Sequence, residues 1–207
     1  PGVTITNGID VNRVSMRRGD PFLGEELRFL LLVGSPAPWH GVDVLVDSIL
    51  RYEGKVRIHC YVAGNILPAT KEKLKKVSAI TLLPNQADDE LNKLIDLCHI
   101  GIGSLGFENS FLTQASTLKV REYWSRGLPF ILGYDDADLI DNSEMKPFYL
   151  RLKGTELLNM EDVISFAHKI YAVPDVPTKM RALAIHKIDY SIKTRNYFDF
   201  LSYLTNE

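Results

Sequence analysis

The sequence predicts an α/β fold with a doubly wound parallel sheet and a helical carboxyl-terminal tail. Short apolar runs alternate with segments of helical periodicity along most of the chain. The run at 29–33 is continuously apolar, which is typical of a strand buried on both faces. Helices of about ten residues separate successive runs, and this alternation indicates βαβ units.

The individual elements follow from these patterns in chain order. The sequence predicts strands at 29–33, 56–62, 80–83, 99–104, 130–132 and 148–150, and helices at 41–51, 68–77, 88–97 and 117–126. Gly127 and Pro129 close the last of these helices, as a left-handed cap and a following proline do. Beyond residue 154, apolar residues at helical spacing predict the tail.

Composition is that of a globular protein and excludes several classes. The 207 residues are 45% hydrophobic and 24% charged, with a net charge of −2. These values exclude wholesale disorder and leave no electrostatic footprint for nucleic acid. No apolar run reaches the ~20 residues of a membrane helix. Cys60 and Cys98 lie in apolar segments, so we expect two buried thiols in a reducing compartment and a cytoplasmic protein.

Three motif matches are discounted. Residues 101–106 fit G-x-G-x-x-G, but the first glycines fall inside the predicted strand 99–104, which disfavours a dinucleotide site. Asp136 and Asp138 form a D-x-D pair, for which we favour a polar loop over a metal site. The loop 34–41 lacks the G-K-[S/T] of a P-loop. We therefore expect no metal or organic cofactor.

The segment 116–129 carries the strongest indication of function. A helix that begins near Ser116 presents unpaired N–H groups and a positive dipole end, which suit a diphosphate. Lys119 adds a charge, and Glu122 lies on the same helix face, where a carboxylate accepts hydrogen bonds from a ribose diol. The alternative is a Lys119–Glu122 surface pair worth ~0.5 kcal/mol. The residues alone do not favour either interpretation, the nucleotide site or the surface pair.

A resemblance to a known family favours the nucleotide site. The stretch 118–131 resembles the signature P-L-K-x-x-E-Y-M-A-x-G-x-P-V-I of family 4 glycosyltransferases of the GT-B fold, which are Rossmann-like. The stretch 7–10 resembles the N-G-I-D that leads into their second domain. The loop 34–43 resembles their donor-phosphate loop, and 63–65 resembles the G-x-G after their second strand. The similarity covers about residues 3–135.

The resemblance implies a role for each matching residue. Glu122, Lys119 and Gln114 become the candidate catalytic group, with Glu122 binding the ribose of the nucleotide sugar. Leu83 and Pro84 are expected to line the base pocket, and the first loop is expected to approach the phosphates. The implied substrate-binding residues are Gly34, Ser35, His40, Gly41, Asn65, Leu83, Pro84, Ser116, Thr117 and Leu118.

The sequence departs from the family at two places. Ser35 and His40 stand where the family pairs an arginine and a lysine in the first loop. His40 is able to donate to phosphate, and is a cation only if the dianion raises its pKa. Gln114 stands where the E-x7-E pattern has an acid, and Glu108 is an unaligned candidate for that duty.

The resemblance also predicts the organisation of the chain. We expect an interdomain lead-in at 1–24, an α/β core at 25–154 and a helical tail at 155–207. The acceptor-binding domain is expected to precede Pro1. The stretch 197–204 is apolar around more than one face, which suits a final helix that packs on that domain; packing on this domain alone is the alternative.

The function expected from the resemblance is hexosyl transfer in polysaccharide or glycoconjugate synthesis. The partners would be a UDP- or GDP-linked sugar and the preceding domain, without which the chain is expected to be inactive and through which any membrane contact would be made. Two alternatives stay open: a non-catalytic nucleotide-binding or interaction module, and, ranked last, an NAD-dependent oxidoreductase.

Overall fold

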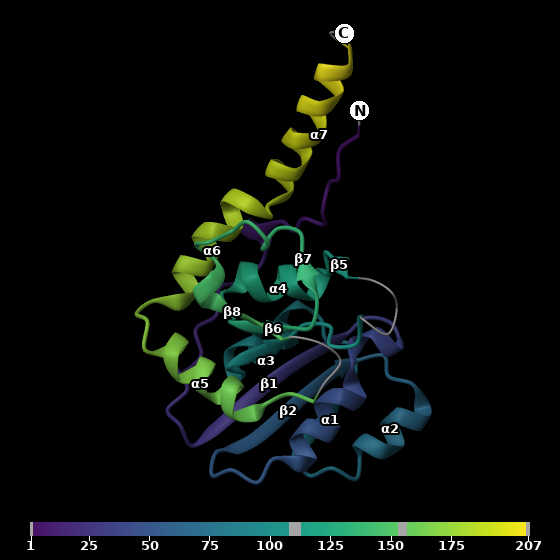
Figure 1. Ribbon diagram of the computed structural model, residues 1–207, viewed down its shortest axis with the longest axis vertical. Helices are drawn as coiled ribbons and strands as arrows, with labels where there is room; N and C mark the ends of the chain where they lie inside the picture. Colours follow the sequence, from purple (N-terminus) through teal and green to yellow (C-terminus); the bar gives the residue numbers. More distant parts are fainter. Residues whose placement is uncertain (1, 108–112, 153–156, 206–207) are drawn as a thin grey trace.

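The computed structural model describes residues 2–107, 113–152 and 157–205. Its centre is a six-stranded parallel sheet with the strand order β3-β2-β1-β4-β6-β8 (Figure 1). The strands are β1 (Glu26–Val33), β2 (Arg57–Gly64), β3 (Ile80–Leu83), β4 (Ile100–Ile102), β6 (Phe130–Leu132) and β8 (Tyr149–Arg151). The predicted doubly wound parallel sheet is confirmed, since every pairing in this sheet is parallel.

Helices cover both faces of the sheet. Alternate residues of β1 point to opposite faces, so Phe29 and Leu31 join one apolar cluster while Leu30 joins the other. The first cluster receives the apolar faces of α1 (Val42–Arg51), α2 (Pro68–Leu74) and α5 (Met160–Tyr171). The second receives those of α3 (Asp88–Leu97), α4 (Leu118–Arg126) and α6 (Val176–Lys187).

The predicted elements agree with the observed ones to within a few residues. The predictions 80–83, 88–97 and 130–132 have the same bounds as β3, α3 and β6. The predicted strand 99–104 is shorter in the structure, because only Ile100–Ile102 pair with neighbours. Both cysteines are buried and free, as expected. A short ladder between β5 (Gln114–Ala115) and β7 (Asp135–Asp136) was not predicted.

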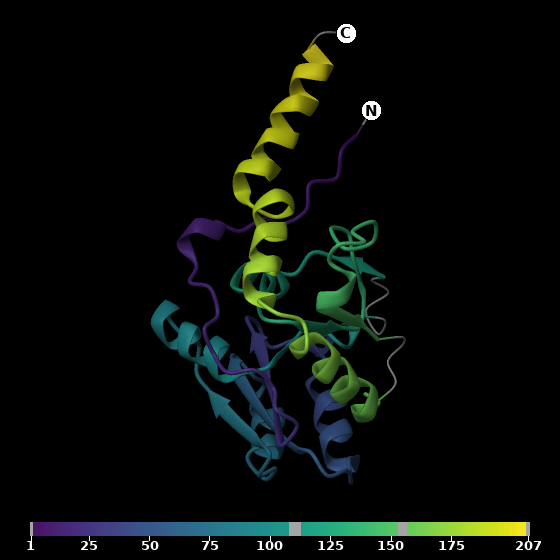
Figure 2. The ribbon, with the colours of Figure 1, turned by 90° about the vertical axis from the view of Figure 1, so that its left-hand side faces the viewer.

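The last helix leaves the body of the molecule. Helix α7 (Tyr190–Thr205) projects away from the sheet, and the amino-terminal residues run beside its base (Figures 1 and 2). Ile9 joins the two segments, since its N–H donates to Ile188 O and its carbonyl accepts from Tyr190 N–H, both at 3.0 Å. Within the described ranges, no helix is both long and apolar enough to cross a bilayer.

The topology places one crevice at the carboxyl ends of the strands. The chain leaves β1 toward β2 and returns from β3 to β4, so β1 and β4 are adjacent strands whose connections run in opposite directions. In open α/β sheets, ligands bind at such a switch point. The loops after β1 and β4 and the start of α4 meet there.

Candidate functional site: a cavity at the start of helix α4

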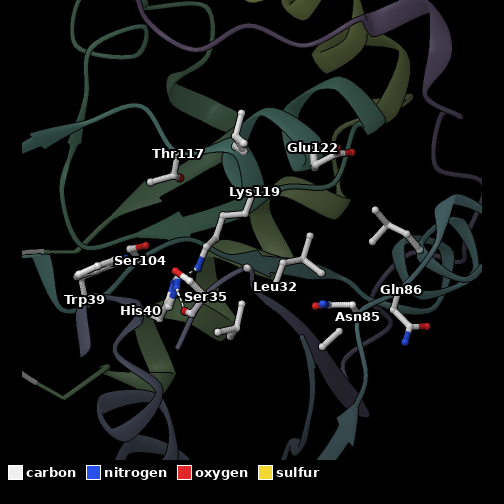
Figure 3. Close-up of a pocket in the computed structure, with 15 residues that line it drawn as sticks. Leu32, Ser35, Trp39, His40, Asn85, Gln86, Ser104, Thr117, Lys119 and Glu122 are labelled. Atoms are coloured by element: carbon white, nitrogen blue, oxygen red, sulfur yellow. Dashed lines mark hydrogen bonds between the residues drawn. The ribbon is translucent and has the colours of Figure 1, made fainter. Parts of the chain in front are cut away.

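A cavity of about 490 Å³ lies at this switch point (Figure 3). Its walls come from the loops after β1, β3 and β4 and from the first two turns of α4. Seven of the predicted site residues line it: Gly34, Ser35, His40, Thr117, Leu118, Lys119 and Glu122. The structure thus brings together residues that are up to 88 positions apart in the sequence, from 34 to 122.

Helix α4 begins one or two residues later than expected. Thr117 is its N-cap residue and makes no side-chain hydrogen bond to the helix. The Thr117 hydroxyl instead pairs with Tyr134 Oη at 2.6 Å. The first N–H groups of α4 are therefore not capped by this side chain, and the positive end of the helix dipole lies at the cavity wall.

Lys119 and His40 form a buried pair in the cavity wall. Lys119 Nζ lies 2.8 Å from His40 Nδ1, and His40 Nε2 lies 2.9 Å from the Ser35 carbonyl (Figure 3). The carbonyl fixes the proton on Nε2, so Nδ1 accepts from Lys119. Burial and the nearby Lys119 lower the pKa of His40 to about 4. His40 is therefore a neutral acceptor near pH 7, and here the cationic role considered for it falls to Lys119.

Burial also changes the charge behaviour of Lys119. Its removal from water lowers the pKa of Lys119 to about 7. An amine with that pKa is half protonated at neutral pH. A phosphate nearby would favour the charged ammonium form. Ser35 and His40 stand at the first-loop positions where the resembled family has an arginine and a lysine. Ser35 has no charge and His40 is a neutral imidazole, so the cation of this pair is Lys119.

Glu122 pairs with an arginine of its own helix. Its carboxylate accepts from Arg126 Nε at 2.8 Å, and the Glu122 side chain is 28% exposed while Arg126 is buried. Arg126 also donates to Asn92 Oδ1. The alternative of a Lys119–Glu122 surface pair is therefore wrong. Lys119 bonds to His40, and Glu122 bonds to Arg126. Glu122 lines the cavity with carboxylate lone pairs still available.

The two glycines of the first loop, Gly34 and Gly41, have different structural surroundings. A Cβ on Gly34 would meet nothing within 4 Å, so this position opens onto the cavity. Gly41 has φ of +66°, and a Cβ there would lie 2.6 Å from Leu105 Cβ. Gly41 is therefore required by loop packing, and the predicted close approach to phosphate fits Gly34 only.

The residues predicted for the base pocket line a neighbouring cavity. Asn65, Leu83 and Pro84 contribute to a cavity of about 530 Å³ that shares Asn85 with the first one. Asn65 Nδ2 donates to Gly34 O at 3.2 Å and so braces the first loop. These three residues lie next to the α4 cavity and not in its wall.

Ser116 and Gln114 are not among the residues that line the cavity. Ser116 Oγ accepts from Asn7 N–H at 2.9 Å and from Arg121 at 2.7 Å, so its hydroxyl is engaged in the protein. Gln114 pairs with Asp135 in the short β5–β7 ladder. Glu108, the other candidate for the sugar contact, lies outside the described residues.

The D-x-D pair is a structural ion-pair cluster. Arg121 donates to both oxygens of Asp136 at 2.9 Å and to Asp138 at 2.8 Å, with all three side chains buried. Lys193 of α7 reaches Asp138 at 2.6 Å, and Thr6 donates to Asp138 at 2.7 Å. Among the residues that the structure describes, no group of three metal-ligating side chains occurs. The predicted polar loop is wrong for Asp136, which lies in β7, and both carboxylates are buried in ion pairs. The absence of a metal site here stays a prediction.

Several cavity residues were missed from the sequence. They are chiefly residues that follow a strand end, namely Trp39, Asn85, Gln86 and Ser104. The rule that ligands bind beyond the carboxyl ends of parallel strands directs attention to these positions. Of the glycines in the G-x-G-x-x-G match, Gly101 lies in β4, whereas 103 and 106 follow it. A Cβ on each would lie within 3 Å of Tyr123, Ile131 or Pro38 respectively, so packing within the protein accounts for these glycines, and the absence of a dinucleotide site stays a prediction.

The architecture defines the fold of the chain. A Rossmann-like sheet of this order, with its crevice at the start of α4, is the fold of the carboxyl-terminal domain of GT-B glycosyltransferases. No protein-family model and no curated protein sequence match the chain.

Solved glycosyltransferase structures share this fold. HepE from Anabaena, crystallised with UDP, gives a TM-score of 0.67 at 15% identity and covers 96% of this chain and 56% of its own. Sucrose-phosphate synthase from Thermosynechococcus elongatus has a TM-score of 0.66 at 11% identity. The match covers 98% of this chain and 53% of the synthase chain. The catalytic domain of cholesterol-α-glucosyltransferase from Helicobacter pylori has a TM-score of 0.56 at 12% identity. The match covers 77% of this chain and 98% of that domain. The chain thus spans about half the length of the first two proteins.

Proposed function

We propose that this chain is the donor-binding domain of a glycosyltransferase and that it binds a nucleotide-diphosphate sugar in the α4 cavity. The observation that carries the proposal is the arrangement of three features along one cavity wall. These are the uncapped start of α4, the Lys119 ammonium in its first turn and the Glu122 carboxylate one turn later. The first two attract a diphosphate, and the third accepts hydrogen bonds from a ribose.

The orientation of the donor follows from these charges. The ribose lies on the side of Glu122, where Asn85 and Gln86 supply amide groups for the base (Figure 3). The diphosphate lies over the start of α4, and Gly34 leaves the space that a phosphate needs. The crystallisation of HepE with UDP supports a uridine nucleotide as the first ligand to test.

Hexosyl transfer by a two-domain enzyme is the activity proposed for the whole protein. The lead-in, core and tail are assigned to residues 1–24, 25–154 and 155–207, and an acceptor-binding domain would contact α7. The apolar side chains exposed on α7 support such a contact: Tyr197, Phe198, Leu201 and Leu204. With the acceptor site on the other domain, we expect this chain alone to bind donor but not to transfer sugar.

Titration calorimetry with UDP, GDP, UDP-glucose, GDP-mannose and NAD tests the proposal. We expect one nucleotide series to bind and NAD to give no heat. Absence of binding by every nucleotide sugar would contradict it, and sugar transfer by this chain alone would contradict the two-domain assignment.

A non-catalytic nucleotide-binding module is the second candidate. Ser35 and Gln114 replace charged residues of the resembled family, and the positive charge on Lys119 is weakened by burial. Nucleotide binding without transfer, even when the preceding domain is present, would favour this candidate.

A further inference from the structure

Ser104 has a buried hydroxyl that no packing or hydrogen-bonding role explains. The residue follows β4, is fully buried, and its Oγ finds no hydrogen-bond partner among the described residues. A buried hydroxyl without a partner is unfavourable, because it has lost its hydrogen bonds to water. Alanine would occupy the same place without that cost.

The backbone holds Ser104 firmly in this position. Its carbonyl accepts from Gly133 N–H at 3.0 Å. The next two residues donate to the first loop, Leu105 to His40 O at 3.3 Å and Gly106 to Trp39 O at 3.1 Å. These bonds hold the backbone of Ser104 beside the cavity, where Ser104 is one of the lining residues.

Three other polar side chains of this wall have protein partners. His40 bonds to Lys119 and Ser35, Thr117 bonds to Tyr134, and Glu122 bonds to Arg126. Ser104 Oγ differs from them in having an unused donor and two unused acceptor positions. A ligand oxygen is the group that would satisfy it.

The position of Ser104 along the cavity indicates which part of the ligand it meets. In Figure 3, Ser104 and Trp39 lie on one side of Lys119, and Glu122, Asn85 and Gln86 lie on the other. If Glu122 binds the ribose, as the proposed function has it, the α-phosphate lies near Lys119 and the β-phosphate lies toward Ser104.

We propose that Ser104 is a substrate-binding residue that donates a hydrogen bond from Oγ to the β-phosphate of the nucleotide sugar. A hydrogen bond to a charged phosphate oxygen gives the buried hydroxyl its missing partner. The β-phosphate is the leaving group's terminal phosphate, so this contact also orients the bond to the transferred sugar. The proposal rests on the proposed function and assigns a further residue to the same site.

The Ser104→Ala variant tests the proposal with three readouts: the affinity for UDP, the affinity for UMP and the melting temperature. Its affinity for UDP should fall about 10- to 150-fold, because a hydrogen bond to a charged group is lost. Its affinity for UMP, which has no β-phosphate, should stay within about twofold of the wild type. Its melting temperature without nucleotide should equal or exceed that of the wild type, because an unpartnered hydroxyl is removed.

Ser48→Ala is the matched control. Ser48 Oγ is also buried, but it donates to Val44 O at 2.6 Å and accepts from Leu158 N–H at 2.8 Å, away from the cavity. This variant should melt at a lower temperature and keep the wild-type affinity for UDP.

Two results would overturn the assignment of Ser104 while leaving the proposed function intact. One is wild-type affinity of Ser104→Ala for UDP, and the other is an equal loss for UDP and UMP. If the wild-type chain binds the guanosine series instead, GDP and GMP replace UDP and UMP in the same comparison. If it binds no nucleotide of either series, both the proposed function and this inference fail.

Discussion

Glu122 is the residue on which nucleotide recognition is proposed to depend most. Replacement by alanine removes a carboxylate that accepts hydrogen bonds, so nucleotide affinity should fall about 10- to 150-fold in calorimetry. Glu122→Gln should keep part of that affinity, since the amide oxygen still accepts. The loss of the Arg126 pair lowers stability in both variants, so melting curves are recorded alongside. Unchanged nucleotide affinity in Glu122→Ala would remove Glu122 from the site.

From the lowered pKa of Lys119 we predict that donor binding depends on pH. Its pKa is about 7 in the protein, and a bound diphosphate favours the protonated form. Above pH 7 a proton must be taken up on binding, so affinity for UDP-glucose should fall as pH rises from 7 to 9, approaching tenfold per unit. His40, whose pKa is lowered to about 4, stays neutral throughout that range.

Lys119→Met is the variant that isolates this effect. It keeps much of the side-chain volume and has no titratable group, so its binding should be weaker and independent of pH. A pH slope that persists in Lys119→Met would assign the titration to another group.

Alanine variants of Gly34 and Gly41 should have different effects: the first on nucleotide binding and the second on stability. Gly34→Ala should leave the melting temperature close to that of the wild type, because its Cβ meets no atom within 4 Å, yet it should weaken UDP binding by filling the cavity. Gly41→Ala should destabilise the chain by more than about 1 kcal/mol, because of its positive φ and the contact with Leu105. Equal UDP affinity in Gly34→Ala and the wild type would contradict the placement of phosphate beside this loop.

At the scale of elements, the Arg121 cluster ties three segments to α4. Arg121 binds Asp136 and Asp138 after β6 and donates to Asn7 O, while Lys193 attaches α7 to Asp138. Removal of one partner of a buried ion pair leaves an uncompensated charge. The cluster thus fixes the base of α7 and the lead-in against the core.

Disruption of this cluster should be costly. Asp138→Ala should lower the free energy of unfolding by about 3–5 kcal/mol in urea denaturation. Glu72→Ala, which removes the exposed pair with Lys75, is the control and should leave the free energy of unfolding close to that of the wild type. A small effect of Asp138→Ala would mean that the core holds α7 without these charges.

Most elements could be predicted from the sequence because their signals are local. The run at 29–33, the acidic first turn of α3 and the Gly127–Pro129 stop each indicate an element through near neighbours. The β5–β7 ladder has no such signal, since two-residue strands are stabilised by contacts distant in sequence.

The candidate site was predictable only in part. Helix periodicity and the dipole argument indicate Lys119 and Glu122, but not that His40 and Arg126 bind them, because those contacts depend on burial and on loop placement. The same limit explains why Asp136 and Asp138 read as an ordinary polar loop, although tertiary packing buries them against Arg121. Ser104 carries no local signal beyond its place after a strand.

At the scale of the whole molecule, α7 presents apolar side chains that the core does not cover. Phe198 and Leu201 are exposed, and the helix projects from the body (Figure 2). Simultaneous replacement of both by serine should leave the free energy of unfolding of this chain within about 0.5 kcal/mol per residue and its UDP affinity unchanged. A larger loss of stability in urea denaturation would mean that α7 packs on this domain.

The account as a whole rests on where the donor binds, and a crystal structure with UDP tests that most directly. We predict the diphosphate at the start of α4, within hydrogen-bond distance of its first N–H groups and of Lys119, with the ribose hydroxyls on Glu122. A UDP molecule bound elsewhere, or a Glu122 carboxylate that contacts Arg126 alone in the complex, would contradict the account.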